Sequence, residues 1–156
     1  MELFLCRHGQ AEPAGATATD EERQLTETGR DETRLVAGAL QRAGLSFDQL
    51  FSGPLTRARQ TAEILGEILG VSAEVTERLR PGRRLGDVQQ LLADRHGGRF
   101  LLVGHEPDFG RIASQLIGGG RIRMATSGIA CVQTDRVEPG AGRLIWLVTP
   151  EVLPSA

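Results

Sequence analysis

The sequence contains no lysine, and all 18 of its basic residues are arginines. This absence excludes sites that depend on a lysine side chain: the phosphate-binding loop of P-loop enzymes, a lysine Schiff base and a lysine general base. Asparagine is absent too, so the chain has no acceptor for N-linked glycosylation. The absence of lysine therefore excludes kinase and P-loop functions.

Cysteine is scarce, with two residues, and neither is placed for catalysis. Cys6 and Cys131 lie in apolar, strand-like stretches, where a free thiol packs as a small hydrophobic side chain, and we expect no disulfide between them. A cysteine-dependent phosphatase needs an arginine six positions after its nucleophile. Glu12 and Val137 occupy those positions, so the spacing excludes that class of enzyme.

Histidine is also scarce, with three residues in the chain. A two-metal hydrolase needs several ligands close together, and only His105, Glu106 and Asp108 cluster in the sequence. We therefore expect neither a metal nor any other cofactor.

No apolar run is long enough to span a membrane, and Met1 leads directly into a strand-like segment. We therefore expect a cytoplasmic protein without a transmembrane helix or signal peptide. The formal net charge of -2 gives no general attraction to nucleic acid or to an anionic membrane. With 156 residues, 40% of them hydrophobic and 24% charged, the composition is that of a globular protein, and we expect one domain over residues 1–156.

Strand-like and helix-like segments alternate along the chain, which is typical of a layered α/β domain. Short apolar runs predict strands at 3–6, 47–52, 71–75, 100–103, 128–137 and 144–148. Apolar residues at helical spacing predict helices from Thr26 to Gly44, from Pro54 to Gly70, around 88–92 and from Pro107 to 117, with a polar loop over 10–24. We expect a three-layer αβα domain with a mostly parallel central sheet, whose edge is antiparallel because the last two strands form a hairpin.

The tripeptide Arg-His-Gly occurs twice, in two different contexts. Arg7-His8-Gly9 follows the first predicted strand, at the carboxyl end of which ligands bind in open α/β sheets. Arg95-His96-Gly97 is expected to close a helix, where basic residues suit the helix dipole and glycine suits the left-handed cap. We interpret His96 as structural, and a hydrogen-bonded structural histidine is also the alternative for His8.

His105 follows the predicted core strand that ends near Gly104. Two of the three histidines therefore lie just past the ends of core strands, and we expect both to face the same crevice. An imidazole nitrogen can attack phosphorus in line and form a phosphorylated enzyme that water then cleaves. The charge of the phosphoryl group must be neutralised by cations held in place, and Arg7 is one candidate.

Arg57 is a second candidate cation, because it lies in the first turn of a predicted helix that starts just past a strand. Its guanidinium and the N-terminus of the helix can both point at an anion. A solvated surface position is the alternative. That alternative describes Arg59 better, because Arg59 projects from another face of the helix.

Three motifs, in this order, resemble those of the histidine phosphatase superfamily. They are Arg7-His8-Gly9 after an N-terminal strand, Pro-Leu-Thr-Arg-Ala-Arg-Gln-Thr-Ala at 54–62, and Val-Gly-His-Glu-Pro at 103–107. The similarity spans nearly the whole chain. More narrowly, residues 7–11, 25–29 and 126–130 are similar to the small SixA-type phosphohistidine phosphatases. The resemblance implies that His8 is the phosphorylated nucleophile and that Arg7, Gly9, Arg57 and His105 form the phosphate pocket, in which His105 stabilises the charge of the transition state.

The chain departs from larger superfamily members at the general acid. Many phosphoglycerate-mutase-like members have a Leu-x-Glu whose carboxylic acid protonates the leaving oxygen, whereas this chain has Leu79-Arg80-Pro81. The imidazole expelled from phosphohistidine is a better leaving group than an alkoxide, so the missing acid favours a phosphoramidate substrate. Glu77 and Glu106 remain candidate proton donors, with a solvated loop residue or a helix-start charge as the alternative.

A second departure is length, because residues 62–100 leave no room for a lid insertion over the pocket. An open pocket suits a phosphorylated side chain on another protein, and Arg78, Arg80, Arg83 and Arg84 could dock an acidic partner, with a solvated charged loop as the alternative. We predict a phosphatase that hydrolyses phosphohistidine on a protein, such as a phosphotransfer domain of a signalling relay. The alternatives are a metal-free phosphatase for small phosphomonoesters, such as a phosphosugar or a nucleotide, and a phosphate-binding module without turnover.

Overall fold

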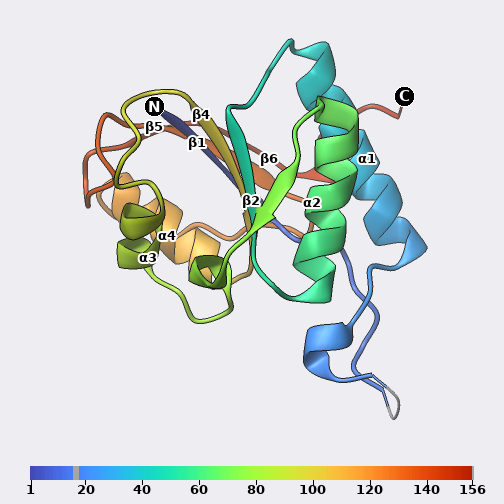
Figure 1. Ribbon diagram of the computed structural model, residues 1–156. Helices are drawn as coiled ribbons and strands as arrows, with labels where there is room; N and C mark the ends of the chain where they lie inside the picture. The colour runs from blue at the N-terminus through green and yellow to red at the C-terminus, as the bar shows by residue number, and fades with distance from the viewer. Residues whose placement is uncertain (16–17, 156) are drawn as a thin grey trace.

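The computed structural model describes residues 1–15 and 18–155, and these build a three-layer α/β arrangement around one mixed sheet (Figure 1). The strands are β1 (Glu2–Arg7), β2 (Gln49–Ser52), β3 (Ala73–Val75), β4 (Arg99–Gly104), β5 (Ile129–Gln133) and β6 (Arg143–Val148). The helices are α1 (Glu27–Arg42), α2 (Thr56–Leu69), α3 (Leu85–Leu91) and α4 (Asp108–Leu116). Three 3-10 turns accompany them: η1 (Asp20–Glu22), η2 (Glu77–Leu79) and η3 (Pro150–Val152).

The sheet has the order β3-β2-β4-β1-β5-β6. The strands β3, β2, β4 and β1 are parallel, whereas β5 pairs antiparallel with β1 and β6 pairs antiparallel with β5. This arrangement confirms the expected fold class, including the antiparallel edge. The strand β5 is shorter than predicted, because it ends at Gln133 rather than at Val137.

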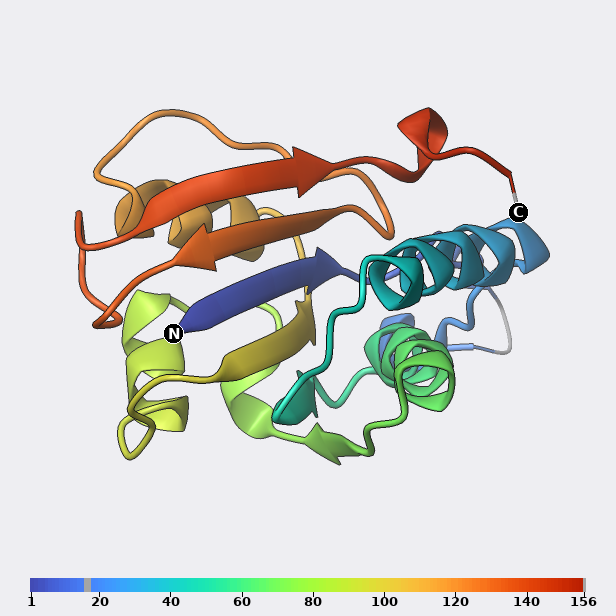
Figure 2. The same cartoon turned by 90° about the horizontal axis from the view of Figure 1, so that it is seen from above.

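The two faces of the sheet are covered by different helix pairs, α3 and α4 on one side and α1 and α2 on the other (Figure 1). The strands themselves are seen side by side in Figure 2. One face packs against α3 and α4 through residues such as Val88, Ile112 and Leu116. The other face packs against α1 and α2 through Val36, Ala58 and Leu65. The central strands β1 and β4 are therefore buried on both faces, as their unbroken apolar sequences predict.

The helix ends follow from the local sequence. The side chain of Thr26 accepts a hydrogen bond from the backbone N–H of Gly29 over 2.9 Å and thereby caps α1. Gly70 ends α2 in the left-handed conformation, at φ 73°. The start of α2 was predicted at Pro54, but the helix begins at Thr56, because Leu55 adopts an extended conformation with φ -69° and ψ 143°.

Two other segments differ from the sequence-based expectation. His96 does not close a helix, since α3 ends at Leu91 and His96 lies exposed in the connection to β4. The loop expected over 10–24 contains the turn η1, and its residues Ala16 and Thr17 lie outside the described part of the chain. Both free cysteines, Cys6 and Cys131, are buried as expected. In the part of the chain that the structure describes, no helix has the length and apolar character needed to cross a lipid bilayer.

Candidate active site

The two histidines predicted to face one crevice lie side by side. The strands β1 and β4 are parallel neighbours in which Arg7 is opposite Gly104, so the residues that follow emerge at the same edge of the sheet. The backbone N–H of His8 donates to the carbonyl of Gly104 over 2.9 Å and continues this register. As a result, the ring centroids of His8 and His105 are 5.0 Å apart, with an angle of 57° between the ring planes.

The imidazole of His8 is held in one tautomer by its neighbours. Its Nδ1 lies 2.8 Å from the carbonyl oxygen of Gly9, and because a carbonyl can only accept, Nδ1 carries the proton. The lone pair is therefore on Nε2, which accepts a hydrogen bond from Nε of Arg57 over 3.3 Å. This arrangement presents an unprotonated ring nitrogen to the cationic side of the site.

The electrostatic surroundings keep His8 neutral at neutral pH. Burial is the main cause of the lowered pKa, because only 8% of the residue is exposed, whereas the hydrogen bond to the carbonyl of Gly9 acts in the opposite direction. The positive charges of Arg57, Arg7 and Arg23 lower the pKa further, to about 4. A neutral imidazole with a free lone pair is the form that attacks an electrophile.

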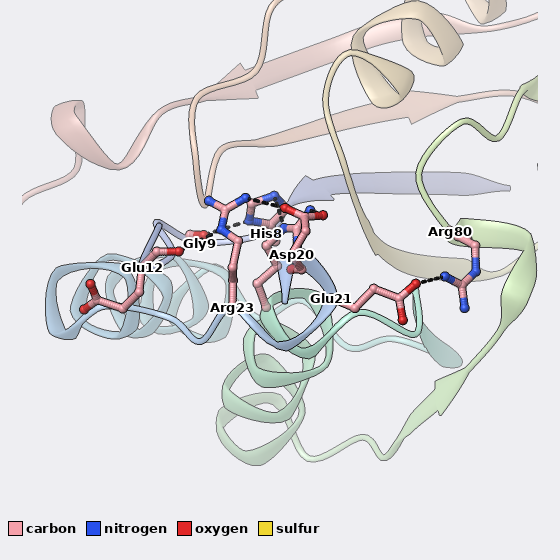
Figure 3. A network of polar contacts seen from close by, with 8 residues as sticks. His8, Gly9, Glu12, Asp20, Glu21, Arg23 and Arg80 are labelled. Carbon is pink, nitrogen blue, oxygen red and sulfur yellow. Dashed lines mark hydrogen bonds and ion pairs between the residues drawn. The ribbon is translucent and has the colours of Figure 1, made fainter. Parts of the chain in front are cut away.

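Arg57 reaches the site from the first turn of α2, as its position in the sequence predicts. The residue is buried, and all three sides of its guanidinium have partners. Two of the residues that contact it, His8 and Asp20, are labelled in Figure 3. Nε donates to His8, Nη1 donates to the backbone carbonyl of Asp20 over 2.8 Å, and Nη2 lies 3.4 Å from Oδ2 of Asp20. The guanidinium is thus fixed between the candidate nucleophile and the turn η1.

Arg7 supplies a second guanidinium at the end of β1. Its Nη1 donates to the carbonyl of Met124 over 3.0 Å, while its Nε is buried without a hydrogen-bond partner in the protein. Burial lowers the pKa of Arg7 below its ordinary value, the carboxylate of Glu106 acts to raise it, and the charge of Arg123 lowers it further. A partly buried cation whose buried Nε is an unused donor is suited to hold an anion.

His105 has no hydrogen-bond partner in the protein, although it is only 3% exposed. Both its ring nitrogens are unsatisfied, and with Nε of Arg7 they are the buried side-chain nitrogens without partners among the residues that the structure describes. Burial and the neighbouring His8, Arg57 and Arg7 lower the pKa of His105 to about 3. Unsatisfied buried polar groups that converge in one place indicate a ligand site, and the two arginines select an anion.

Gly9 lies in close contact with neighbouring segments of the chain. A Cβ atom at this position would come within 3.0 Å of the carbonyl oxygen of Gly29 and within 3.1 Å of the hydroxyl of Ser127. The backbone N–H of Gly9 donates to the hydroxyl of Thr61 over 2.9 Å. Gly9 therefore allows the loop after His8 to dock against α1 and α2, which fixes the direction of the His8 ring.

The two candidate proton donors from the sequence are engaged elsewhere. The carboxylate oxygens of Glu106 accept from the backbone N–H groups of Gly110 and Met124, over 2.6 and 3.2 Å. The carboxylate of Glu77 pairs with Arg80, which keeps the pKa of Glu77 below its usual value. Neither residue presents a free carboxylic acid to His8.

Sequence reasoning missed several residues that shape the site. Asp20 and Arg23 come from the loop before α1, where no periodic pattern marks any position. Thr61 was recognised only as part of a motif, although it lies one helical turn after Arg57 and its hydroxyl bonds both to the carbonyl of Arg57 and to Gly9. Thr61 lies four residues after Arg57, and residues at this spacing share one face of a helix. This spacing was the signal in the sequence that pointed to Thr61.

Metal binding finds no support in the side chains. Within residues 1–15 and 18–155, no group of three or more histidine, cysteine, aspartate or glutamate residues could hold a metal ion. A hollow of about 450 Å³ lies between α2 and β3, but neither histidine lines it.

Comparison with known proteins gives a consistent set of relatives. A family model described as the histidine phosphatase superfamily (branch 1) matches residues 3–98. The chain is 35% identical over 156 residues to phosphohistidine phosphatase SixA of Escherichia coli strain K12, covering 96% of this chain and 94% of that protein. It is 41% identical over 123 residues to an uncharacterised protein of Picosynechococcus, covering 76% of this chain and 74% of that protein.

Solved structures agree with these sequence relatives. The structure of the protein histidine phosphatase SixA complexed with tungstate superposes with a TM-score of 0.86, at 33% identity, over 96% of this chain and 97% of that one. A phosphoserine phosphatase from Entamoeba histolytica has the same fold, with a TM-score of 0.71 at 15% identity, over 96% of this chain and 98% of that one.

Proposed function

Because the chain belongs to the histidine phosphatase superfamily, we propose that it is a hydrolase that removes the phosphoryl group from phosphohistidine on a protein, with His8 as the nucleophile. One observation carries this proposal. The Nε2 lone pair of a neutral His8 lies against the guanidinium of Arg57, beside a buried His105 whose ring nitrogens have no partner. This is the arrangement that an in-line attack on a bound phosphoryl group requires.

In the first half of the reaction, Nε2 of His8 attacks phosphorus while the P–N bond of the substrate breaks. The electron pair of that bond goes to the substrate imidazole, which leaves. Nδ1 of His8 keeps its proton, bonded to the carbonyl of Gly9, so the attacking ring becomes cationic as it binds phosphorus. Phospho-His8 is then hydrolysed by water, which regenerates the neutral imidazole.

The cationic groups act on the charge of the transferring phosphoryl group. The guanidinium groups of Arg7 and Arg57 bind its equatorial oxygens, and Nε and Nη2 of Arg57 exchange their present partners for the anion. His105, neutral in the free protein, gains affinity for a proton when a dianion binds beside it and then donates a hydrogen bond. These residues supply the electrostatic stabilisation that the transition state needs.

The leaving group decides between substrate classes. No carboxylic acid is available at Leu79-Arg80-Pro81, and Glu77 and Glu106 are bound elsewhere. Arg23 and Arg57 keep the pKa of Asp20 below its usual value, so in the free protein this side chain is a carboxylate and not an acid. An alkoxide leaving group would need such an acid, whereas an imidazole that is already protonated on its other nitrogen leaves as a neutral molecule. Phosphohistidine is therefore the substrate that fits, ahead of small phosphomonoesters.

We further propose that residues 1–156 act as one domain without a lid insertion, and that its partner is a phosphotransfer domain of a signalling relay. The arginines of η2 and of the loop that leads to α3 offer the partner a basic surface. Of these, Arg80 is already paired with Glu77 and Glu21, Arg78 contacts Gln90, and Nε of Arg83 donates to the carbonyl of Glu77 over 3.0 Å. Arg84 is therefore the one to test. A cytoplasmic location suits the two buried free thiols.

The test compares the turnover of a phosphohistidine protein with that of a panel of small phosphate esters, with divalent metals chelated. We expect the phosphohistidine protein to have the higher kcat/KM, and the His8→Ala variant to have no activity on it. Arg59→Ala, an exposed change on the same helix as Arg57, is the matched control and should retain activity. A preference for the esters would contradict the proposed substrate, and binding without turnover would indicate a phosphate-binding module.

A further inference from the structure

The carboxylate of Asp20 occupies the place where a phosphoryl oxygen would bind Arg57. Nε–H and the neighbouring Nη2–H of an arginine point in the same direction and form the fork that grips phosphate groups. In this protein Nε–H donates to Nε2 of His8 over 3.3 Å, while Nη2 lies 3.4 Å from Oδ2 of Asp20. Because both acceptors belong to one fork, Oδ2 of Asp20 and the nitrogen of His8 that would carry the phosphoryl group lie on the same side of the guanidinium. Both residues are labelled in Figure 3.

The turn that carries Asp20 is fixed by contacts that do not involve Oδ2. The carbonyl of Asp20 accepts from Nη1 of Arg57 over 2.8 Å, on another side of the guanidinium. Glu21 pairs with Arg80 at 2.5 Å, and Nε of Arg23 donates to the carbonyl of Glu12 over 2.7 Å. When a phosphoryl group takes the fork, the side chain of Asp20 must therefore turn aside, but its backbone remains beside the phosphoryl group.

Other carboxylates near the site have fixed partners of their own. Glu106 accepts from two backbone N–H groups, Asp108 accepts from the N–H of Gly82 over 2.8 Å, and Glu77 pairs with Arg80. Among the described residues, Asp20 is the carboxylate that contacts the guanidinium bound to His8. It is also 63% exposed at its side chain, so water reaches it.

We propose that Asp20 is the general base of the second half-reaction and accepts a proton from the water that attacks phospho-His8. This inference rests on the proposed function. The water oxygen forms a bond to phosphorus, the P–Nε2 bond breaks, and its electron pair returns to His8. One proton of the water passes to Oδ2 of Asp20 and then to solvent, while the other leaves with the phosphate.

The pKa of Asp20 should depend on whether a phosphoryl group is bound at the site. In the free protein the hydrogen bond from Arg23, followed by the charge of Arg57, keeps the pKa of Asp20 below its usual value. The charge of Asp20 also acts to raise the pKa of His105, against the burial and the positive charges that lower it. A phosphoryl dianion that takes the fork removes one cation from Asp20 and adds a neighbouring negative charge, and both changes strengthen the base.

The experiment follows the formation and decay of phospho-His8 in single-turnover, rapid-quench reactions with a phosphohistidine protein. Asp20→Asn keeps the size of the side chain and the backbone tether, so it should form phospho-His8 at nearly the wild-type rate and hydrolyse it about 100-fold more slowly. Asp20→Glu should restore part of the decay rate. The decay rate should fall at low pH in the wild type but should not vary in this way in Asp20→Asn.

Glu22→Gln is the matched control, because Glu22 is an exposed carboxylate of the same turn, and its decay rate should equal that of the wild type. Thermal unfolding of both variants checks that the fold is retained. A wild-type decay rate in Asp20→Asn would overturn the inference. Tighter binding of orthophosphate with faster turnover would overturn it too, since Asp20 would then only compete for Arg57. Absence of phospho-His8 in the wild type would instead contradict the proposed function, and this inference with it.

Discussion

Thr61 accepts a hydrogen bond from the backbone N–H of Gly9 over 2.9 Å, which ties the helix that carries Arg57 to the residue after His8. The same hydroxyl donates to the carbonyl of Arg57 over 2.8 Å, so one side chain links both proposed partners in the phosphate pocket. Thr61 is completely buried. We infer that it sets the distance between the nucleophile and the guanidinium.

Replacing Thr61 by valine should therefore impair catalysis through geometry. The variant leaves the buried N–H of Gly9 without an acceptor, at a cost of about 1–3 kcal/mol of stability. We expect kcat to fall by about tenfold while the protein still folds, as measured by steady-state kinetics and urea unfolding. Thr61→Ser retains the hydroxyl and should retain activity. Wild-type kcat and stability in the valine variant would contradict this role.

Arg57→Lys tests whether the guanidinium fork is needed, rather than its charge. Lysine is a single point charge and cannot direct two parallel donors at one phosphoryl group. We expect kcat/KM to fall by about 100-fold or more. Arg59→Lys is the control on the same helix, and it should have no effect because Arg59 is exposed. Equal activity of Arg57→Lys and the wild type would show that charge alone is sufficient.

The buried histidines should make folding stability depend on pH. The pKa of His105 is lowered to about 3 in the folded protein, so between that value and the ordinary value near 6.5 the unfolded chain binds more protons. Stability is therefore complete above pH 6.5 and decreases as the pH falls toward 3. At pH 5 this single group lowers the free energy of unfolding by about 2 kcal/mol relative to pH 7.

Urea unfolding of His105→Gln at pH 5 and pH 7 measures this contribution. The difference between the two pH values should be about 2 kcal/mol smaller than in the wild type. His96→Gln removes an exposed histidine and should leave the wild-type difference unchanged. The account of the His105 environment would be wrong if both variants had the wild-type pH dependence.

The sequence was sufficient to predict which strand ends meet. The apolar runs that precede His8 and His105 mark buried parallel strands, and the carboxyl ends of parallel strands share one edge of a sheet. The helix that carries Arg57 was recognisable from its apolar stripe and from Gly70. These features depend on local periodicity, and for that reason they can be read from a single chain.

Asp20 and Arg23 could not be predicted in this way. The conformation of their loop is determined by ion pairs to distant residues, with Asp20 bound to Arg57 and Glu21 bound to Arg80. Ion pairs between positions 37 or more residues apart leave no periodic signal in the sequence. The same holds for the contact between the hydroxyls of Thr33 and Ser127, 2.9 Å apart, which joins α1 to the segment before β5.

The central claim is that phosphate is transferred to Nε2 of His8. The most direct measurement is mass spectrometry of the protein quenched at alkaline pH during turnover of a phosphohistidine protein, with the acid-labile phosphate located by peptide. The account predicts one phosphorylated residue, His8, and no phosphorylation or hydrolysis in His8→Ala. Phosphate on another residue, or full hydrolysis by His8→Ala, would contradict the account.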